Sequence, residues 1–350
     1  MAVAGAGAFG RNHLRVVREL EEACEGVALV AAVEPDAARA IEADKKYGIP
    51  VFAAIEELLK ADLKLDAACV AVPTVKHHEV ASVLLEAGLD LLVEKPLAAN
   101  LKEADDLIQK QEKSGRIVQP GHLERFNPAV LAVEPKLKRP MFFEAHRLSV
   151  FTPRALDVDV VLDLMIHDLD IVLAFAKSPV REVRAVGLPI LSPKVDIANV
   201  RVEFESGCVA NFTASRVSTE RVRKLRYFEP RQYVSIDYAR RDVLVIRLDA
   251  GGGLPAELAA VIAAGKADAA LLKKLAADGF APGLSFAKPE VTPGEPLRLE
   301  ILSFLESVRT RREPKVTARQ GRAALELALQ IQATMAAHAE RAGLGDFFKN

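Results

Sequence analysis

The chain opens with the stretch MAVAGAGAFGRNH, Met1–His13, in which three glycines directly follow the first apolar residues. By itself the G-x-G-x-x-G spacing is a weak signal, because a small-residue turn produces it too. Its context is more informative. Met1–Gly5 is predicted to be a short strand, and residues 10–26 carry apolar residues at helical spacing. A glycine run between a strand and a helix is the context that a dinucleotide-binding turn requires.

Each glycine has a physical reason in such a turn. Gly5 permits the tight turn, Gly7 lets the backbone approach a pyrophosphate, and Gly10 lets the helix pack closely on the strand. The helix N-terminus offers free N–H groups and the positive end of its dipole to the phosphates. The few residues before the glycines would fit a native start that was trimmed or misassigned. The residues expected to bind the cofactor in this turn are Gly5, Gly7, Ala8, Phe9 and Gly10.

Glu34 ends the second predicted strand, where a carboxylate can accept hydrogen bonds from the adenosine ribose hydroxyls. The same charge repels a 2′-phosphate, so the sequence favours NAD over NADP as cofactor. Arg39 lies nearby and weakens that preference. The alternative is a structural turn followed by a solvated glutamate.

Strand-like and helix-like segments continue to alternate through the first third of the chain. Uniformly apolar strands of this kind belong in a parallel sheet that helices cover on both faces. We therefore predict an α/β protein with a doubly wound N-terminal domain. The further strands are expected within residues 27–35, 50–53, 65–74, 89–96 and 116–122, with helices between them.

The overall composition excludes several classes of protein. With 350 residues the chain suits two domains, and a net charge of −1 gives no indication of a nucleic-acid partner. Neither a membrane-length apolar run nor a basic leader is visible, so a cytoplasmic location is expected. The three cysteines show no metal-ligand spacing and are predicted to be buried apolar residues. We expect no metal.

Three further motifs follow in order: VPTVKHHEVA at Val72–Ala81, VEKPLA at Val93–Ala98 and DLMIHDLD at Asp163–Asp170. Together with the glycine run and the C-terminal helical stretch, they resemble the glucose–fructose oxidoreductase/inositol dehydrogenase (Gfo/Idh/MocA) family. The resemblance implies a Rossmann domain over residues 1–121. Residues 122–350 would form an α+β domain for substrate binding and oligomerisation. That domain is expected to have a large open, mostly antiparallel sheet, with the last helices packing back on the Rossmann domain.

The resemblance also implies an NAD-dependent dehydrogenase acting on CH–OH groups. Its active site would lie between the domains, and its sheet would join a homodimer or homotetramer. Lys95 follows a buried strand, and its ammonium can stabilise negative charge on the reacting oxygen. In similar proteins the Lys–Pro peptide is cis. From the residues alone, Glu-Lys-Pro is more often a surface turn, and only the resemblance makes Lys95 a catalytic candidate.

Asp163 and His167 are spaced i, i+4, so on a helix they share a face, with Asp170 on the same side. A carboxylate that orients an imidazole suits a general base. The pair could instead hold the helix to the sheet. His167 and Asp170 could also be ligands of a metal ion, but the sequence offers no further ligand set. We predict catalysis by Lys95, Asp163 and His167.

The segment QPGHLERFNPAV, Gln119–Val130, places hydrogen-bonding groups just after a strand. His122, Arg125 and Asn127 are expected to contact substrate; alternatively Asn127 caps the next helix. Arg154, Asp163 and His167 complete the expected substrate contacts. Beyond the glycine turn and Glu34, the expected cofactor contacts are Pro73, Thr74, His77, Glu94 and Lys95.

Basic residues gather at Arg216, Arg221, Arg223, Lys224 and Arg226, either as a solvated sheet edge or to bind a diphosphate. The second alternative fits the branch that this sequence resembles most, the UDP-N-acetylglucosamine 3-dehydrogenases. The sequence departs from that branch over about residues 249–295, an Ala/Gly-rich insertion. Two other functions remain open: a dehydrogenase of a free sugar or inositol, and a catalytically silent NAD-binding regulator.

Overall fold

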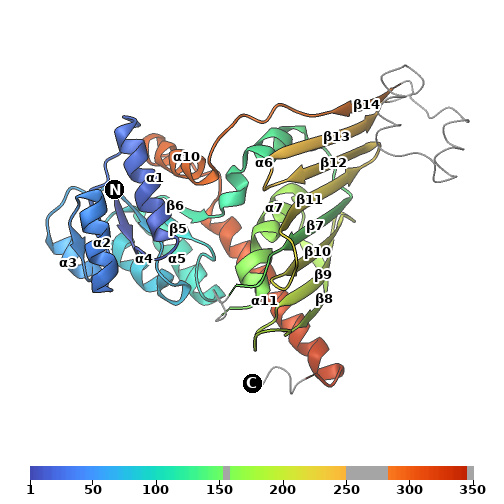
Figure 1. The fold of residues 1–350 in the computed structure, drawn as a ribbon, viewed down its shortest axis with the longest axis horizontal. Coiled ribbons are helices and arrows are strands. Elements are labelled where there is room, and N and C mark those ends of the chain that lie inside the picture. The colour runs from blue at the N-terminus through green and yellow to red at the C-terminus, as the bar shows by residue number, and fades with distance from the viewer. Residues whose placement is uncertain (153–157, 250–282, 345–350) are drawn as a thin grey trace, which may run out of the picture. The chain divides into compact units, whose positions relative to one another are not determined.

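The computed structural model describes residues 1–152, 158–249 and 283–344. The chain divides into two compact units, each built on its own sheet (Figure 1). The first unit comprises Met1–Phe126 and Gly294–Gln330, and the second comprises Asn127–Pro293 and Ile331–Asn350. A parallel sheet in the first unit and a mostly antiparallel sheet in the second confirm the predicted α/β class.

The first sheet has six described strands, all parallel, in the order β3-β2-β1-β4-β5-β6. The chain moves from β1 to β3 in one direction along the sheet, and from β4 to β6 in the other. Right-handed connections in opposite directions place their helices on opposite faces. Ligands bind such sheets where the direction reverses, beyond the carboxyl ends of the strands. The strands are β1 (Ala2–Ala4), β2 (Ala31–Val33), β3 (Val51–Phe52), β4 (Ala67–Val70), β5 (Asp90–Glu94) and β6 (Val118–Gly121).

The helices of this unit begin and end at residues that satisfy their terminal backbone groups. Asp36 Oδ1 accepts the Arg39 N–H at 2.9 Å at the start of α2, and Asn100 Oδ1 accepts the Glu103 N–H at 3.0 Å at the start of α5. Gly115 ends α5 in the left-handed conformation. The helices are α1 (Gly10–Glu22), α2 (Ala37–Tyr47), α3 (Ile55–Lys60), α4 (His77–Glu86) and α5 (Leu101–Ser114).

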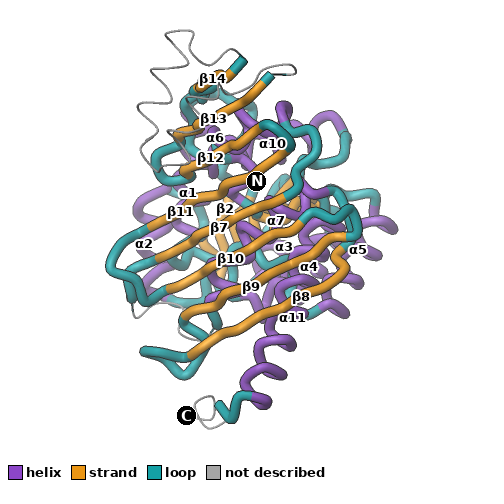
Figure 2. Tube along the Cα trace, turned by 90° about the vertical axis from the view of Figure 1, so that its right-hand side faces the viewer, coloured by secondary structure: helices purple, strands orange, loops and turns teal. Residues whose placement is uncertain are grey.

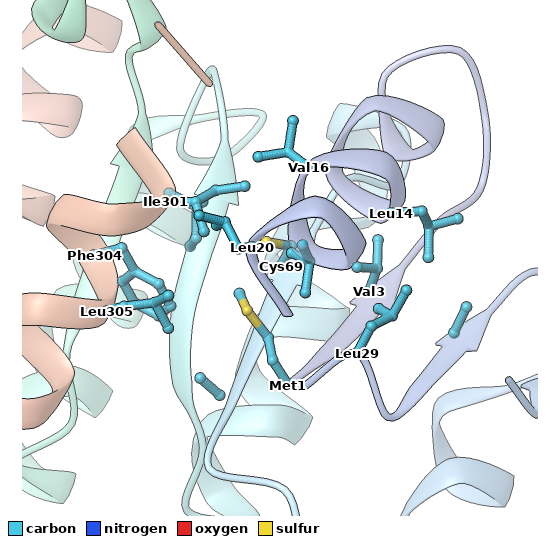
Figure 3. Close-up of a cluster of buried hydrophobic side chains, with 14 of the residues drawn as sticks. Met1, Val3, Leu14, Val16, Leu20, Leu29, Cys69, Ile301, Phe304 and Leu305 are labelled. Atoms are coloured by element: carbon cyan, nitrogen blue, oxygen red, sulfur yellow. The ribbon is translucent and has the colours of Figure 1, made fainter. Parts of the chain in front are cut away.

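The C-terminal helix α10 (Pro296–Thr310) completes the core of the first unit. Its residues Ile301, Phe304 and Leu305 pack with Leu20 of α1 and with Met1 (Figure 3). Helix α11 (Ala318–Arg341) follows, and its Gly321 lies so close to Pro120 that an added Cβ would be 2.5 Å from the proline ring. A segment nearly 300 positions away in sequence therefore belongs to the N-terminal core.

The second sheet has eight described strands in the order β14-β13-β12-β11-β7-β10-β9-β8. Within it, β7 and β10 are parallel, and the other described neighbours are antiparallel. Strand β14 shows that part of the unusual 249–295 stretch extends this sheet; residues 250–282 lie outside the described ranges. The strands are β7 (Phe142–Leu148), β8 (Val180–Leu188), β9 (Ile197–Phe204), β10 (Val209–Ser215), β11 (Val222–Glu229), β12 (Gln232–Asp237), β13 (Asp242–Leu248) and β14 (Leu284–Ala287).

Alternation along the strands gives this sheet two different faces. Phe143 and Tyr227 are buried and pack with Phe175 of α7 (Ile166–Ala176). Their neighbours along the strands, such as Phe142 and Phe228, point to the opposite face, which the described helices of the unit leave uncovered (Figure 2). The short helix α6 (Pro128–Val133) contacts β12 and β13.

A buried ion pair ties α7 to the sheet. Arg147 of β7 donates to Asp168 through Nε at 2.7 Å and Nη2 at 3.0 Å, and both side chains are almost fully buried. The Arg147 guanidinium also lies over the Tyr238 ring, 5.2 Å from its centroid. This bidentate pair fixes the helix that carries His167 and Asp170.

A second buried pair organises the loop between β8 and β9. Asp196 accepts backbone N–H groups of Ile190, Leu191 and Ser192 at 2.6–2.8 Å, and Arg216 Nε at 2.7 Å. Burial alone would raise the pKa of Asp196, but the Ser192 hydroxyl, Arg216 and the backbone donors outweigh burial and hold that pKa well below its usual range. The stability that this carboxylate contributes is therefore present above an unfolded-state pKa of about 4 and is lost as the pH falls below that value.

Two other features of the fold bear on the sequence predictions. Cys69 and Cys208 are buried as expected, but Cys24 is exposed just after α1, so its predicted burial is wrong. The reason is local: Cys24 takes a positive φ of 56° in the turn that ends the helix. None of the described helices is long and apolar enough to cross a membrane.

We expect Asp196→Asn to lower the free energy of unfolding at pH 7 by about 3 kcal/mol, because it leaves Arg216 buried without its anion. The variant should also lose part of the fall in stability that the wild type shows between about pH 5 and pH 3. Urea denaturation at several pH values measures both effects. Glu182→Gln, in the exposed Arg184–Glu182 pair, is the control and should change stability by less than about 1 kcal/mol. Equal losses in both variants would contradict this account of Asp196.

Candidate active site

The glycine turn has the geometry that its sequence predicts. Gly5 has φ +94°, and a Cβ there would lie 2.6 Å from the Ala71 carbonyl oxygen. A Cβ on Gly10 would lie 1.8 Å from the Gly5 carbonyl oxygen, so the start of α1 can approach the turn only without a side chain. A Cβ on Gly7 would meet nothing within 4 Å. Gly5 and Gly10 are required for packing, whereas Gly7 faces open space suited to a phosphate.

The N-terminus of α1 lies at this open space. No side chain caps the helix there, and Ala8 and Phe9 are exposed. The Arg11 and Asn12 N–H groups bond to the Gly7 and Phe9 carbonyl oxygens at 3.0 and 2.9 Å, so the turn itself forms the helix start. The positive end of the helix dipole there favours a pyrophosphate. The turn therefore fits the dinucleotide that the sequence predicts.

Glu34 is almost fully buried at the end of β2, and both of its oxygens accept hydrogen bonds. Oε2 accepts the Ala6 N–H at 2.8 Å, and Oε1 accepts the Asp36 N–H at 3.0 Å and Arg39 Nη2 at 2.9 Å. The carboxylate thus connects the glycine turn to the start of α2. Arg39 is half exposed, so it can leave Glu34 when ribose hydroxyls arrive.

Lys95 directly follows β5, at the carboxyl edge of the parallel sheet where this fold binds ligands. The strand before it is buried throughout, whereas Lys95 is partly exposed. The Lys95–Pro96 peptide is cis, as the family resemblance implied. A lysine at this edge can donate a hydrogen bond to an oxygen of a ligand.

His77 contacts the backbone of the turn that carries Lys95. Its Nδ1 lies 2.8 Å from the Pro96 carbonyl oxygen, its Nε2 lies 3.0 Å from the Val72 carbonyl oxygen, and the ring is buried. Burial lowers the pKa of His77 despite these two contacts. Both ring nitrogens face the backbone, so we expect His77 to act on a cofactor through the turn. Pro73 directly precedes the short turn η1 (Thr74–Lys76), and Thr74 begins it.

A further histidine, which was not predicted as a site residue, contacts the glutamate that precedes the lysine. His13 of α1 is fully buried, and its Nε2 is 2.7 Å from Oε1 of Glu94. Glu94 Oε2 in turn accepts the Lys95 N–H at 3.3 Å. The visible signal was a histidine three positions after the last glycine, on a face of α1 that is otherwise apolar.

The segment after β6 is more buried than expected for substrate contacts. His122, Arg125 and Asn127 each have less than 5% of their surface exposed. Asn127 Oδ1 accepts the Ala129 N–H at 3.1 Å as the N-cap of α6, and Nδ2 donates to the Tyr238 carbonyl oxygen at 3.1 Å. For Asn127 the geometry therefore favours the helix-capping alternative. A substrate role for His122 and Arg125 stays a prediction.

In the second unit, Asp163 and His167 do not lie on one regular helix. Asp163 belongs to the π-helical turn η4 (Val161–Met165), and His167 belongs to α7. A π-turn is wound more widely than an α-helix, and it continues directly into α7. The predicted pairing of Asp163 with His167 stays a prediction. Asp163 and His167 are partly exposed, and Asp170 is buried. Such turns are frequent at functional sites.

Asp159 holds the π-turn in place. Its Oδ1 accepts the Val161 and Leu162 N–H groups at 3.0 and 3.1 Å, and its Oδ2 accepts Gln332 Nε2 from α11 at 2.7 Å. Asp159 and the Arg147–Asp168 pair thus fix the two ends of the segment that carries Asp163 and His167. Neither support was predicted from the sequence, because Gln332 and Arg147 are distant in the chain from the carboxylates that they meet.

The basic residues of the second unit do not form one cluster. Arg216 is buried against Asp196, Arg226 donates to Glu144 at 2.9 Å, and Lys224 lies 3.8 Å from Asp237. Lys224 and Arg226 are partly exposed on the sheet, as the alternative of a solvated edge expects, whereas Arg216 is buried and fits neither alternative. Arg154, an expected substrate contact, lies outside the described residues. Within the described ranges, no group of three or more His, Cys, Asp or Glu side chains is placed to hold a metal ion.

Two family profiles match the chain, one in each half. The profile described as "Oxidoreductase family, NAD-binding Rossmann fold" matches residues 1–122, and the profile described as "GFO/IDH/MocA C-terminal domain" matches residues 133–231. The first covers the glycine turn, Glu34 and Lys95. The second covers Asp163 and His167.

Characterised relatives and solved structures point the same way. The UDP-N-acetylglucosamine 3-dehydrogenase of Acidithiobacillus ferrooxidans is 30% identical over 97% of this chain and 98% of its own length. Its crystal structure superposes with a TM-score of 0.82, covering 100% of this chain and 98% of that chain at 29% identity. The scyllo-inositol 2-dehydrogenase (NAD(+)) of Bacillus subtilis is 27% identical over 62% of this chain and 67% of its own length. The chain therefore belongs to the Gfo/Idh/MocA oxidoreductases, a family of NAD-dependent dehydrogenases that act on CH–OH groups.

Proposed function

We propose that the chain oxidises the 3-hydroxyl of a nucleotide sugar, UDP-N-acetylglucosamine, with NAD as hydride acceptor. The observation that carries this proposal is the 30% identity to a UDP-N-acetylglucosamine 3-dehydrogenase over 97% of the chain. That similarity continues through the second unit, which in this family binds the substrate. The dinucleotide-binding geometry of the first unit supports the cofactor half of the proposal.

In this proposal three side chains act on one hydroxyl group of the substrate. His167 takes the proton of the substrate hydroxyl, and Asp163 orients the imidazole and stabilises its charged form. Lys95 donates a hydrogen bond to the same oxygen and stabilises the negative charge that develops on it. Bound NAD would supply the hydride acceptor. These three roles are supported by the match of each residue to a family motif and by its position at the end of a strand or helix.

A dehydrogenase of inositol or a free sugar is the second candidate. It is favoured by the inositol 2-dehydrogenases among the relatives, which match with similar identity. Their similarity, however, covers 62% of this chain or less, whereas that of the UDP-sugar enzyme covers 97%. A substrate preference resides in the second unit, so the longer match favours the nucleotide sugar.

We propose that NAD is preferred over NADP because of Glu34. Its buried carboxylate lies at the end of β2, where a 2′-phosphate would have to bind. Arg39 already pairs with that carboxylate, so its charge is not available to a phosphate unless the pair breaks.

We propose further that the uncovered face of the second sheet joins copies of this chain into a homodimer or homotetramer. Figure 2 shows this face of the sheet, and strand register aligns an apolar row across it. In the row, the Phe228 ring lies 5.4 Å from the Phe142 ring and 5.1 Å from the Tyr233 ring. Charged pairs such as Arg226–Glu144 lie beside the row. An apolar centre with polar surroundings is typical of protein interfaces. The row consists of Phe142, Phe228, Tyr233, Ile246 and Phe286.

We expect Lys95→Ala and His167→Ala each to lower turnover by about a hundredfold or more, because each removes a group that acts on the reacting oxygen. The assay follows NADH formation at 340 nm with UDP-N-acetylglucosamine, and with myo-inositol and glucose for comparison. NADH binding, measured by fluorescence, should stay within about threefold. Lys110→Ala, at an exposed ion pair with Glu86, is the control. Unchanged turnover in both active-site variants would end this assignment.

We expect Glu34→Gln to raise kcat/KM for NADP by roughly tenfold, because the substitution removes a negative charge from the 2′-phosphate position while keeping a hydrogen-bonding oxygen. Adding Arg39→Ala should reverse the gain. Steady-state kinetics with NAD and NADP test both changes. Glu42→Gln, in the exposed pair with Arg11, should leave the preference unaltered. The account of Glu34 is contradicted if Glu34→Gln has the same cofactor preference as the wild type.

We expect Phe228→Asp to shift the protein toward monomer, because it puts an unpaired charge at the centre of the apolar row. Light scattering after size-exclusion chromatography gives the mass of each species. Ile41→Asp makes the same chemical change at an aliphatic residue of the first unit that is 67% exposed, and it should keep the wild-type mass. A monomeric wild type would refute the proposed interface.

A further inference from the structure

The His13–Glu94 contact joins two segments that both bear on the proposed site. His13 lies in the first turn of α1, directly after the glycine turn, and Glu94 immediately precedes Lys95. The 2.7 Å bond between His13 Nε2 and Glu94 Oε1 spans 81 positions of sequence. It therefore links the helix expected to bind the pyrophosphate with the strand end that carries the catalytic candidate.

The neighbouring residues leave room for this contact and enclose it. β5 and β6 pair Glu94 with Gly121, and a Cβ on Gly121 would lie 3.1 Å from Glu94 Cδ and 3.2 Å from Oε1. Any side chain there would push the carboxylate away from the histidine. On the other side, the Phe9 ring of the glycine turn contacts His13 edge-on, with centroids 5.6 Å apart.

The contact is almost fully removed from water, since the His13 side chain is 0% exposed and that of Glu94 is 11% exposed. Burial opposes an imidazolium, but the side chains of Cys69 and Glu94 outweigh burial and raise the pKa of His13 above its ordinary value. A buried hydrogen bond of 2.7 Å between an imidazole and a carboxylate is short and directional, so it fixes both side chains. His13 is fully buried, so solvent does not compete for its Nε2.

Glu94 passes this constraint to the backbone of Lys95. Its second oxygen accepts the Lys95 N–H, while His77 Nδ1 contacts the Pro96 carbonyl oxygen at 2.8 Å. The main chain that carries Lys95 is thus held by two histidines that come from different helices, α1 and α4. A lysine has four rotatable side-chain bonds, so fixing its backbone limits the positions that its ammonium can reach.

We propose that His13 and Glu94 are a positioning pair, which holds the main chain of Lys95 in register with the cofactor-binding turn so that the ammonium meets the reacting oxygen. The inference rests on the proposed dehydrogenase function. Misplacing a reacting group by about 1 Å can lower the rate a hundredfold without weakening ligand binding. Loss of the pair should therefore affect kcat far more than KM.

Three variants and a matched control separate this role from a general contribution to stability. His13→Leu removes the donor and keeps an apolar side chain, whereas His13→Gln keeps an N–H near the position of Nε2. Glu94→Ala removes the acceptor. The control is His78→Leu, because His78 pairs with Asp106 at the same 2.7 Å distance in the same unit but is partly exposed on α4.

We expect His13→Leu and Glu94→Ala each to lower kcat at least about tenfold, with KM for the sugar within about threefold of wild type. Kd for NADH should stay within about threefold in His13→Leu, the variant that leaves the expected cofactor contact Glu94 in place. His13→Gln should recover most of the kcat lost in His13→Leu. The His13→Leu/Glu94→Ala double variant should be no slower than the slower single variant, because the two residues act as one unit. His78→Leu should keep the wild-type kcat.

The proposal is overturned if His13→Leu keeps the wild-type kcat, if His13→Gln is as slow as His13→Leu, or if the two single losses multiply in the double variant. Circular dichroism and the NADH-binding stoichiometry report the folded fraction, by which every kcat is corrected. A loss of kcat that disappears after this correction also counts against the pair.

A second measurement keeps this inference distinct from the proposed function. Acetylation of Lys95 by acetic anhydride, followed by mass spectrometry, reports how far NADH protects the amine. We expect protection in the wild type, weaker protection in His13→Leu, and wild-type protection in His78→Leu. If the wild type oxidises none of the three sugars but shows this pattern, the proposed function fails and the positioning pair stands. If turnover is present and protection is equal in all variants, the pair fails and the function stands.

Discussion

The close approach of α1 to the end of β1 is the constraint on which the cofactor-binding half of the protein depends. The Gly10 Cα can lie against the Gly5 carbonyl only because Gly10 has no side chain, since a Cβ there would be 1.8 Å from the Gly5 carbonyl oxygen. This approach aims the uncapped helix start at the open space over Gly7. It also places His13, one turn along α1, within reach of Glu94 at the end of β5.

Local patterns were sufficient to predict most of the fold. Apolar strands with helices between them predicted the doubly wound sheet, because burial on both faces removes the polar alternation that other strands show. The glycine spacing predicted the turn, since its requirements are steric and lie within a few residues. The family motifs placed Lys95 after β5 and His167 on α7. In each of these cases the information is contained in one short stretch.

Residue types alone could not predict the partners that fix the candidate site. Arg147–Asp168, Asp196–Arg216 and His13–Glu94 are each separated by at least 20 positions, and nothing in the sequence indicates which arginine meets which carboxylate. The π-turn at Asp163 is a similar case. Asp159 accepts hydrogen bonds from the start of this turn and also from Gln332 of α11, 173 positions away. Asn127 shows the reverse, because a local cap explains a residue that the motif suggested for substrate.

The buried polar groups follow one physical logic. A charge removed from water is costly unless a partner and hydrogen bonds compensate it, and a compensated charge is then held in one geometry. Arg147–Asp168 fixes the helix of His167 in this way, and His13–Glu94 does so for the strand end before Lys95. Apolar packing could hold either element with similar energy, but it tolerates small shifts that a bidentate or charge-assisted hydrogen bond resists. Such pairs are therefore expected beside groups that must meet a substrate atom within a few tenths of an ångström, and both lie next to a residue of the proposed mechanism.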